Sequence, residues 1–548
     1  MSNEGEQMPG WNFADVWEAV AQQIPDADAQ VQGSRRVTWA QFDQRANGVA
    51  QALLDAGVKE QDKVAQYLYN GPEYLESMFA TFKAGLAPIN TNYRYLDDEL
   101  AYLWDNGDVV AVVFHGTFSE RIEGIRTRVP RVKTWLWVDD GEGSCPEWAT
   151  PYDTAAAAGT TKAVAGPWGR SGDHLLLLYT GGTTGMPKGV MWRQDDLFRT
   201  LVGTFVPEVR ENDPDPEQSI IRGAVTASGL VGMPACPLMH GTGCFTQLIV
   251  LAGGGSTVTL ESRNLDMEEM LSTIERERVA TIAIVGDAFA KPMLRALDAN
   301  PGKWDISSLF MVSSSGVMFS EESKQGLLGH HPGMMIVDAF SSSEALGMGQ
   351  SVSSAAGTST TAKFTLGEHT KVITDDGRAV EPGSGETGRV AVGGWQPVGY
   401  YKDPEKTAAT FITFEGKRYS VPGDYATVEA DGSLTLLGRG SVCINTGGEK
   451  VYPEEVEEAL KTIESVNDAV AVGIPDAKFG EAITAVVELN PGETVDEGAV
   501  IAHVKGKLAA YKAPKRVLQI DTIGRAPNGK VDYKRLKAWA ADQLGVTL

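Results

Sequence analysis

Hydrophobic and polar positions along the chain alternate between a helical and a strand-like period. Thr38 and Gln41 have the spacing of a capping box, and the apolar residues that follow recur at helical spacing until Gly57. Residues 64–69 predict a strand, and residues 74–82 again carry apolar side chains at helical spacing. This part of the chain therefore predicts a helix, a strand and a second helix in succession.

The same alternation returns in the middle of the chain. We predict helices over residues 267–278 and 288–299, each followed by a strand, over residues 279–285 and 309–313. Repeated alternation of strands and helices is typical of largely parallel sheets with helices on their faces. The chain is therefore predicted to have an α/β fold.

Beyond about residue 440 the pattern changes to that of a smaller unit. Pro453 is well placed at the start of a helix, and residues 469–474, 482–489 and 515–520 predict strands with helices between and after them. A unit of this length has an ordinary domain size. We expect a large N-terminal domain over residues 1–440 and a small α+β C-terminal domain over residues 441–548, with the boundary near Ser441.

Composition narrows the possible partners. The chain has 548 residues, of which 42% are apolar, and this is enough for more than one core. Its formal net charge of −24 disfavours a nucleic acid as partner, because the phosphate backbone is repelled.

The N-terminus lacks the features of a signal peptide and no apolar stretch is long enough to span a bilayer, so we expect no transmembrane segment and a cytoplasmic location. The four cysteines form no CxxC pair and are expected to be buried thiols.

The most informative stretch is the string HLLLLYTGGTTGMPKGV over residues 174–190. A predicted buried strand over residues 175–178 leads into glycines and threonines, which let backbone N–H groups and hydroxyls approach an anion. Lys188 adds a positive charge, and together these groups suit the triphosphate of ATP. The string lacks the GK[ST] ending of a Walker A loop, which argues against a P-loop kinase or ATPase. The remaining alternative is an ordinary turn rich in glycine and threonine.

The string from Tyr179 to Val190 resembles the signature loop of the adenylate-forming superfamily, which includes acyl-CoA synthetases, adenylation domains and luciferases. Further motifs follow in the order of that superfamily: PLMHG at 237–241, SSGV at 314–317, DAFSSSE at 338–344, PGD at 422–424, LGR at 437–439 and PNGK at 527–530. The resemblance implies a large N-terminal domain of parallel-rich sheets covered by helices, with a small β-barrel-like part. It also implies that the small C-terminal domain is mobile.

The resemblance also implies a role for each motif. Phe340 would stack on adenine, Asp424 would bind the ribose hydroxyls, and Arg439 would lie near the ribose and phosphates. The expected catalytic residues are Lys530, as the adenylation lysine, together with Glu344, Thr184 and His240, and of these Glu344 and Thr184 would hold Mg²⁺. The expected nucleotide- and CoA-binding residues are Thr180, Gly181, Gly182, Thr183, Thr184, Gly185, Lys188, Ser315, Gly316, Asp338, Ala339, Phe340, Ser343, Asp424, Arg439, Gly447, Gly448 and Lys530.

Four positions depart from the pattern of the superfamily. Gly181 replaces the usual serine of the loop, which removes one hydroxyl group. Ser343 replaces threonine and keeps the hydroxyl, whereas Phe340 replaces tyrosine and keeps the stacking face. Ser441 stands where most relatives carry a hinge aspartate or lysine, so the control of domain rotation is open.

The resemblance therefore implies an ATP-dependent acid:CoA ligase that uses Mg²⁺ and coenzyme A. The strings around residues 179–193 and 438–457 look most like bacterial fatty-acyl-CoA synthetases of the group that also accepts steroid side-chain acids. A fatty or other bulky apolar acid is thus the expected substrate, and the pocket candidates are His240, Gly241, Thr242 and Gly243. Two alternatives remain: an enzyme that passes the acyl group to a carrier protein, and a non-catalytic nucleotide-binding homologue. Since many relatives dimerise, a homodimer is expected as well.

Overall fold

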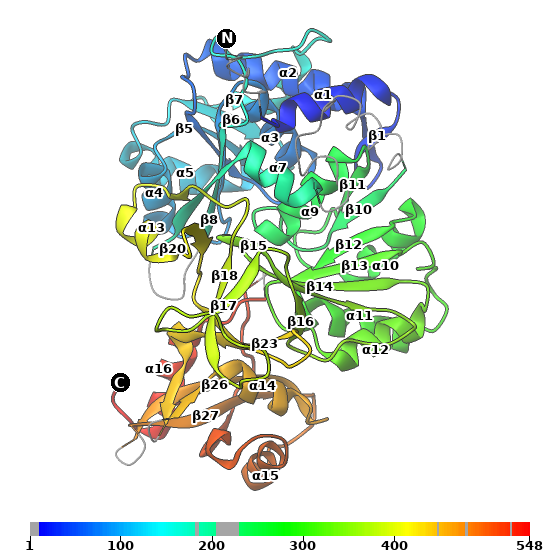
Figure 1. Cartoon of the computed structure of the whole chain (residues 1–548). Helices are drawn as coiled ribbons and strands as arrows, with labels where there is room; N and C mark the ends of the chain where they lie inside the picture. Colours follow the sequence, from blue (N-terminus) through cyan, green and yellow to red (C-terminus); the bar gives the residue numbers. More distant parts are fainter. Residues whose placement is uncertain (1–9, 181–185, 204–228, 447–448, 477–479, 527–528) are drawn as a thin grey trace, which may run out of the picture.

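The strands of the chain form three sheets in the computed structural model, which describes residues 10–180, 186–203, 229–446, 449–476, 480–526 and 529–548. Within these residues the sheets contain eight, 15 and five strands. The two larger sheets make up the main body, and the five-stranded sheet lies at its lower end with the C-terminus (Figure 1). The predicted α/β fold with a small α+β unit is confirmed.

The eight-stranded sheet has a parallel centre and an antiparallel edge. Its strands lie in the order β19 (Gly399–Tyr400), β9 (Lys188–Arg193), β8 (Leu175–Thr180), β4 (Ala87–Asn90), β3 (Lys63–Tyr67), β5 (Val109–His115), β6 (Thr134–Val138) and β7 (Thr150–Pro151). Strands β4, β3, β5 and β6 are parallel, and β8 joins them in the same direction. Strand β9 returns antiparallel to β8, so Thr180 and Lys188, on either side of the expected phosphate loop, lie next to each other.

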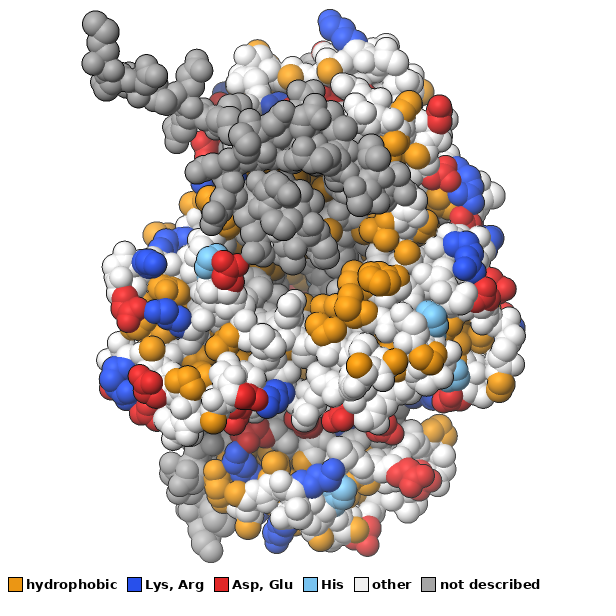
Figure 2. Space-filling model, turned by 45° about the vertical axis from the view of Figure 1, so that its right-hand side comes forward, with side chains coloured by type: hydrophobic (Ala, Val, Ile, Leu, Met, Phe, Trp, Pro, Cys, Tyr) orange, Lys and Arg blue, Asp and Glu red, His pale blue; other side chains and the backbone are white. Residues whose placement is uncertain are grey.

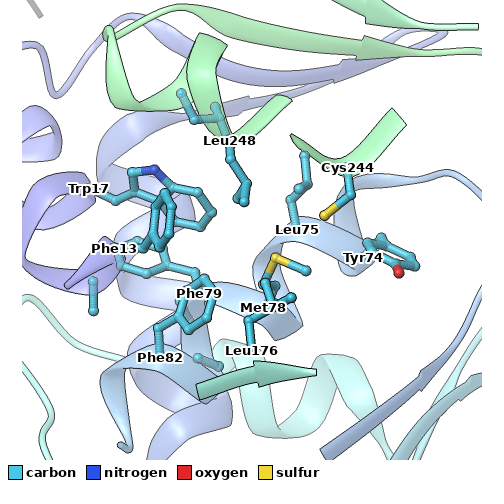
Figure 3. Packing of buried hydrophobic residues seen from close by; sticks show 14 of the residues in the cluster. Phe13, Trp17, Tyr74, Leu75, Met78, Phe79, Phe82, Leu176, Cys244 and Leu248 are labelled. Atoms are coloured by element: carbon cyan, nitrogen blue, oxygen red, sulfur yellow. The ribbon is translucent and has the colours of Figure 1, made fainter. Parts of the chain in front are cut away.

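Alternate residues of β5 enter two different cores, as expected for a buried parallel strand. Ala111 and Val113 face the helices α1 (Phe13–Gln23), α2 (Trp39–Asp55), α3 (Pro72–Lys83) and α9 (Gly241–Ala252). Figure 3 shows aromatic side chains of α1 and α3 packed together, with Leu248 of α9 beside them. Val112 and Phe114 face α4 (Asp97–Asn106) and α5 (Ser119–Ile125) on the other side. The sheet is therefore covered on both faces.

Helix α2 begins where the sequence predicts it. The Thr38 hydroxyl accepts a hydrogen bond from the Gln41 backbone N–H at 3.2 Å, and the Gln41 side chain accepts one from the Thr38 N–H at 2.9 Å. This reciprocal pair satisfies two N–H groups that the helix itself leaves without a partner. The predicted capping box is thus confirmed. The two shorter helices of the region are α6 (Tyr152–Ala157) and α7 (Gln194–Val202).

The 15-stranded sheet begins with a parallel block that carries part of the site. After the antiparallel edge strand β2 (Arg35–Thr38), the order is β1 (Asp28–Gln32), β11 (Ser256–Thr259), β10 (Val231–Pro234), β12 (Thr281–Ile284), β13 (Met311–Ser315) and β14 (Met335–Ser342). Helices α10 (Met267–Glu277), α11 (Asp287–Ala299) and α12 (Glu321–His330) pack beside them (Figure 1). The helices agree with the predicted ranges to within one residue. Strand β13 starts two residues later than predicted, because Leu309 belongs to the preceding turn and its N–H donates to Ile306.

From β14 onward the same sheet becomes antiparallel and forms the smaller β part of the main body. Its strands continue in the order β15 (Ala345–Ser353), β16 (Lys363–Leu366), β23 (Leu434–Arg439), β22 (Asp424–Val428), β18 (Thr387–Val392), β21 (Lys417–Ser420) and β20 (Phe411–Phe414), with β17 (Thr370–Ile373) paired to β18. This arrangement places β14, β22 and β23 in one sheet, although they lie far apart in the sequence.

The small unit has one helix pair and one single helix on opposite faces of its sheet. The strands are β24 (Ile444–Thr446), β25 (Glu449–Val451), β26 (Val466–Asp476), β27 (Gly480–Leu489) and β28 (Arg516–Gln519). Ala469 and Ala471 of β26 face α14 (Pro453–Lys461) and α15 (Glu497–Lys507), whereas Val470 and Val472 face α16 (Tyr533–Leu544). The last strand of the large sheet ends at Arg439, and the first strand of the small sheet begins at Ile444.

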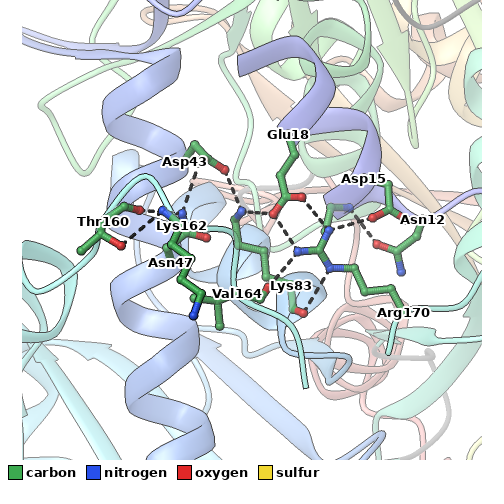
Figure 4. A network of polar contacts seen from close by, with 11 residues as sticks. Asn12, Asp15, Glu18, Asp43, Asn47, Lys83, Thr160, Lys162, Val164 and Arg170 are labelled. Carbon is green, nitrogen blue, oxygen red and sulfur yellow. Dashed lines mark hydrogen bonds and ion pairs between the residues drawn. The ribbon is translucent and has the colours of Figure 1, made fainter. Parts of the chain in front are cut away.

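A buried ion network ties the first helices together (Figure 4). The Lys83 side chain of α3 has no solvent exposure and contacts the carboxylates of Glu18 on α1 and Asp43 on α2, the latter at 2.7 Å. Arg170 also pairs with Glu18, at 2.7 Å. A buried charge is tolerated when it is paired in this way.

Two further predictions concern the chain as a whole. None of the four cysteines, all of which the structure describes, forms a disulfide, and Cys236 and Cys244 are buried. Over the described residues there is no helix with the length and apolar character needed to cross a membrane.

Candidate functional site

The hairpin of β8 and β9 presents the phosphate-loop candidates at one edge of the eight-stranded sheet. Thr180, the last residue of β8, pairs with Lys188, the first residue of β9. The Lys188 ammonium contacts the carboxylate of Asp403, which precedes α13 (Pro404–Thr410), and this contact lowers the pKa of Asp403. The candidates Gly181, Gly182, Thr183, Thr184, Gly185, Gly447 and Gly448 lie outside the described residues.

Two asparagines that the sequence pattern did not single out hold the hairpin and the PLMHG segment in place. The Asn90 side chain accepts from the Tyr179 N–H at 2.6 Å and donates to the carbonyls of Tyr179 at 2.9 Å and Met239 at 2.7 Å. The Asn70 side chain accepts from the Leu238 N–H at 2.7 Å. Because a side-chain amide both donates and accepts hydrogen bonds, it can join backbone groups of two separate segments. Asn90 therefore couples the phosphate hairpin to the candidate acyl pocket.

Glu344 lies in the turn between β14 and β15 and is fixed from several sides. The Tyr400 hydroxyl donates to Glu344 Oε1 at 2.7 Å, and the Ser420 hydroxyl donates to the Glu344 carbonyl at 2.7 Å. The Trp192 indole N–H donates to the carbonyl of the preceding residue, Ser343, at 2.9 Å. This places the Glu344 carboxylate at a defined position, which suits a group that would hold Mg²⁺ beside phosphates. The described residues contain no cluster of three or more His, Cys, Asp or Glu side chains that could hold a metal ion, so Glu344 is a single candidate ligand.

Strand β14 forms an ion pair with the helix that precedes it. Asp338 is 5% exposed and forms an ion pair with Lys324 of α12 at 3.2 Å. Burial raises the pKa of Asp338 to about 6, and the opposing effect of Lys324 is smaller. Two residues further along, Phe340 is 9% exposed and its ring centroid lies 5.4 Å from that of Phe364. Lys324 belongs to none of the sequence motifs, so only the structure reveals it as a partner of Asp338.

Asp424 and Arg439 face each other across β22 and β23. The two residues are paired in the sheet register, and Arg439 Nε lies 3.2 Å from Asp424 Oδ1. Asp424 Oδ2 is buried and has no hydrogen-bond partner among the described residues. A buried carboxylate oxygen without a donor is unfavourable, so the site is suited to receive hydroxyl donors from a ligand. This observation fits the expected contact with ribose hydroxyls.

The turn after β13 brings the adenine and acyl-pocket candidates close together. Ser315 ends β13 and pairs in register with Ala339 of β14. Gly316 follows with φ of +98°, and a Cβ atom at this position would lie 3.9 Å from the Thr242 hydroxyl. Glycine is favoured here because other residues rarely adopt this backbone conformation.

The C-terminal loop delivers Lys530 to this same region. The preceding Gly529 has φ of +70°, and a Cβ atom added there would lie 2.9 Å from the Val317 side chain, so the loop packs against the turn after β13. Desolvation lowers the pKa of Lys530, followed in size by the nearby Arg439, whereas Glu344 and Asp424 act in the opposite direction. Lys530, Arg439, Glu344 and Asp424, which come from four separate motifs of the chain, thus lie within one electrostatic environment.

His240 caps the N-terminus of α9 and lies on the side of the site that faces Lys530. Desolvation, with smaller contributions from Lys530 and Arg94, lowers the pKa of His240 to about 3. The imidazole is therefore neutral at physiological pH. Because the ring carries no charge, the positive charges of Lys530 and Arg94 near it favour an anionic group of a ligand, such as a carboxylate, at this point.

Comparison with known proteins identifies the family to which the chain is similar. Residues 17–401 match the family described as AMP-binding enzyme, and residues 455–530 match the AMP-binding enzyme C-terminal domain. Among curated proteins, the chain is similar to a 3-oxocholest-4-en-26-oate–CoA ligase of Rhodococcus rhodochrous, with 42% identity over 98% of this chain and 96% of the relative. It is also 41% identical to a medium/long-chain-fatty-acid–CoA/3-oxocholest-4-en-26-oate–CoA ligase of Mycolicibacterium smegmatis, over 97% of this chain and 96% of the relative.

Solved structures show the same fold. The anthranilate CoA ligase AuaEII in complex with anthranoyl-AMP superposes with a TM-score of 0.83 at 22% identity, covering 98% of both chains. ATP-bound MatB from Rhodopseudomonas palustris superposes with a TM-score of 0.80 at 23% identity, covering 97% of this chain and 100% of the other. At this level of identity the likeness concerns the fold.

Proposed function

Because the chain belongs to the AMP-binding enzyme family, we propose that it is an ATP-dependent acid:CoA ligase that acts on a fatty acid or a steroid side-chain acid. The enzyme is an AMP-forming acid–thiol ligase, and it uses ATP, Mg²⁺ and coenzyme A. The observation that carries the proposal is the convergence of Lys530 with Glu344, Asp424 and Arg439 at the ends of β14, β22 and β23.

In the first half-reaction, an oxygen of the substrate carboxylate attacks the α-phosphorus of ATP, and the bond to pyrophosphate breaks. Both reactants are anionic, so positive charge has to be held where they meet. Lys530 supplies this charge between the carboxylate and the α-phosphate, and Arg439 supports the ribose and phosphates. Glu344 and Thr184 would hold Mg²⁺, which would supply further charge neutralisation on the phosphates.

In the second half-reaction, the thiol of coenzyme A attacks the carbonyl carbon of the acyl-adenylate, and AMP leaves with the electrons of the broken C–O bond. Lys530 has to withdraw so that the thiol can enter. We assign residues 1–440 and 441–548 to two domains that turn about Ser441 between the half-reactions. Gly447 and Gly448 then approach the pantetheine arm. Such a hinge movement is a common solution for a site that serves two reactions.

The acid occupies the region between the PLMHG segment and the phosphate hairpin. His240, Gly241, Thr242 and Gly243 line it, and a Cβ atom added at Gly241 would lie 3.3 Å from the Leu178 side chain. The buried side chains of Leu178 and Phe245 lie beside Gly241, and apolar neighbours of this kind suit a bulky hydrocarbon. By their names, the relative from Rhodococcus rhodochrous acts on 3-oxocholest-4-en-26-oate, and the one from Mycolicibacterium smegmatis acts on that acid and on medium- and long-chain fatty acids.

The test is an incubation of the purified chain with Mg-ATP and acids from acetate through long-chain fatty acids to aromatic and steroid side-chain acids. AMP and acyl-CoA are measured separately, with and without coenzyme A. Acyl-CoA that forms in step with AMP supports the proposal and identifies the acid. Pyrophosphate release without acyl-CoA would point to transfer onto a carrier protein, and absence of ATP turnover with every acid would contradict ligase activity.

The location of the protein in the cell and its oligomeric state are also part of the proposal. The substrates ATP and coenzyme A favour a cytoplasmic location, which fractionation with a tagged chain can test. A homodimer follows from the resemblance alone, and light scattering on the purified protein measures the mass directly.

A further inference from the structure

The small unit contacts the main body at two places on either side of the Lys530 loop. Asn467 of β26 receives hydrogen bonds from α11, from Lys291 Nζ to its carbonyl at 3.4 Å and from Arg295 to its side chain at 3.3 Å. At the second place α14 lies against β23, and the ring of Tyr452 lies 5.7 Å from that of Tyr425 of β22, centroid to centroid, at an interplanar angle of 33°. Figure 2 shows that Asp and Glu side chains gather along the junction between the two units.

At this second place, the carboxyl group of Glu454, in the first turn of α14, lies directly against β23. Its Oε1 atom accepts from the backbone N–H of Arg439 at 3.5 Å. Its Oε2 atom is buried without a hydrogen-bond partner among the described residues. Gly438, with φ of +120°, makes the approach possible, because a Cβ atom there would lie only 2.0 Å from Oε2. The carboxyl group is therefore enclosed between the two units by the same strand that carries Arg439.

We propose that Glu454 is a positioning residue for acyl-adenylate formation, because its carboxyl group docks α14 on β23 and so keeps Lys530 at the nucleotide site. The inference deepens the proposed function and rests on it. Glu454 acts through Lys530 and Arg439 and has no contact of its own with the reacting atoms. The contact exists only while the small unit is docked in the present orientation, so it is expected to matter for adenylation and not for thioester formation.

The groups around Glu454 disfavour a negative charge on it. Besides Arg439 of β23, the neighbours are Glu457 on its own helix, Asp424 on β22 and Tyr533 on α16. Desolvation is the largest effect and Glu457 the next, and together they raise the pKa of Glu454 from 4.5 to about 8. A buried Oε2 that lacks a donor is consistent with a protonated acid, because a neutral carboxyl group is much less costly to bury than a carboxylate.

Docking is therefore linked to the uptake of a proton. When the small unit turns away, Glu454 meets water and its pKa returns toward the ordinary value of 4.5. The pKa of Glu454 is higher in the docked state than in the undocked state. The contribution of Glu454 to docking is therefore complete at pH values below its undocked pKa, and it is lost as the pH rises toward its docked pKa. In this window the docking equilibrium weakens by up to about tenfold per pH unit. Above the docked pKa of about 8 the dependence levels off.

The experiment compares the wild-type chain with Glu454→Gln, which keeps the shape of the side chain and removes the titration. Glu464→Gln, an exposed position of the small unit, is the matched control for the loss of one negative charge. Adenylation is measured as acid-dependent exchange of pyrophosphate into ATP, and thioester formation as release of AMP from a supplied acyl-adenylate with coenzyme A. Both rates are followed from pH 6 to pH 9, and the readout is their ratio.

We expect the ratio in the wild type and in Glu464→Gln, divided by the ratio in Glu454→Gln at the same pH, to fall by up to about tenfold per unit below pH 8. The division removes the pH dependence that ionisation of the coenzyme A thiol gives to thioester formation in every protein. Hydrogen exchange at the Arg439 amide, corrected for its intrinsic pH dependence, should lose protection over the same range in the wild type and in Glu464→Gln but not in Glu454→Gln. An unchanged slope in Glu454→Gln, or an equal loss of both rates, overturns this inference alone. Absence of acid-dependent exchange in the wild type at every pH overturns the proposed function, and this inference with it.

Discussion

Replacement of Asp424 by asparagine tests the assignment of the ribose site. The substitution keeps the shape of the side chain and removes the charge from Oδ2, the buried oxygen that lacks a partner among the described residues. It also removes the ion pair with Arg439, whose side chain is 43% exposed. The first change affects a ligand that binds there, and the second affects the fold.

The two effects differ in size. A pair with one half-exposed partner is screened by water and contributes at most about 1 kcal/mol to the free energy of unfolding. A hydrogen bond to a charged acceptor contributes about 1.5–3 kcal/mol, which corresponds to a factor of about 10 to 150 in binding. Because the ribose does not change during the reaction, this loss is uniform between ground state and transition state, and it raises KM while kcat changes little. We expect the KM for ATP to rise by about 10- to 150-fold and the KM for the acid to stay within about twofold.

The assay is acid-dependent pyrophosphate exchange with ATP and the acid varied in turn, and a thermal melt is recorded for each protein. Asp431→Asn is the control, because Asp431 lies in an exposed turn of the same antiparallel part and pairs with Lys363 at 3.0 Å. An unchanged KM for ATP in Asp424→Asn would refute the ribose assignment. An equal rise in the KM for the acid would show that the substitution disturbs the whole site instead.

Three further substitutions test other parts of the structure. Lys530→Ala should lower pyrophosphate exchange by at least about 100-fold while thioester formation from a supplied acyl-adenylate persists, and equal loss of both would contradict its role. Lys324→Met leaves the buried Asp338 without its cation, so the melting temperature should fall further at pH 8, where the acid ionises, than at pH 6; an equal fall at both would argue against the pair. Lys83→Met leaves two largely buried carboxylates with fewer partners and should destabilise the fold by about 3 kcal/mol or more in denaturant unfolding, and a smaller change would show that Arg170 compensates.

The fold was largely predictable because its signals are local. The capping box at Thr38 and Gln41 involves residues three positions apart, and the alternation of strands and helices repeats over short windows. The family resemblance was equally predictable, since its motifs are short strings in a fixed order. Boundaries were less certain, as at β13, where an apolar residue of a turn resembled a strand residue.

The partners that hold the site in place were not predictable, because no local pattern marks them. Asn90 lies 89 positions from Tyr179, and Lys324 pairs with Asp338 from α12, the helix that precedes β14. Neither has a spacing that a single sequence reveals. The one available signal was the position of Asn90 at the carboxyl end of a buried parallel strand, where polar residues tend to face ligands or the segments that bind them.

Glu454 shows why the same residue leads to opposite conclusions from sequence and from structure. In the sequence it follows Pro453 in the first turn of a predicted helix, where a negative charge is favourable because it faces the positive end of the helix dipole. That interaction favours the ionised form of the side chain. Docking on β23 replaces the water with Gly438 and brings Asp424 near, and the pKa rises to about 8. The helix dipole and Glu457 belong to the small unit and act on Glu454 in both states, so the pH dependence of docking arises from contacts across the junction, which the local sequence around Glu454 does not show.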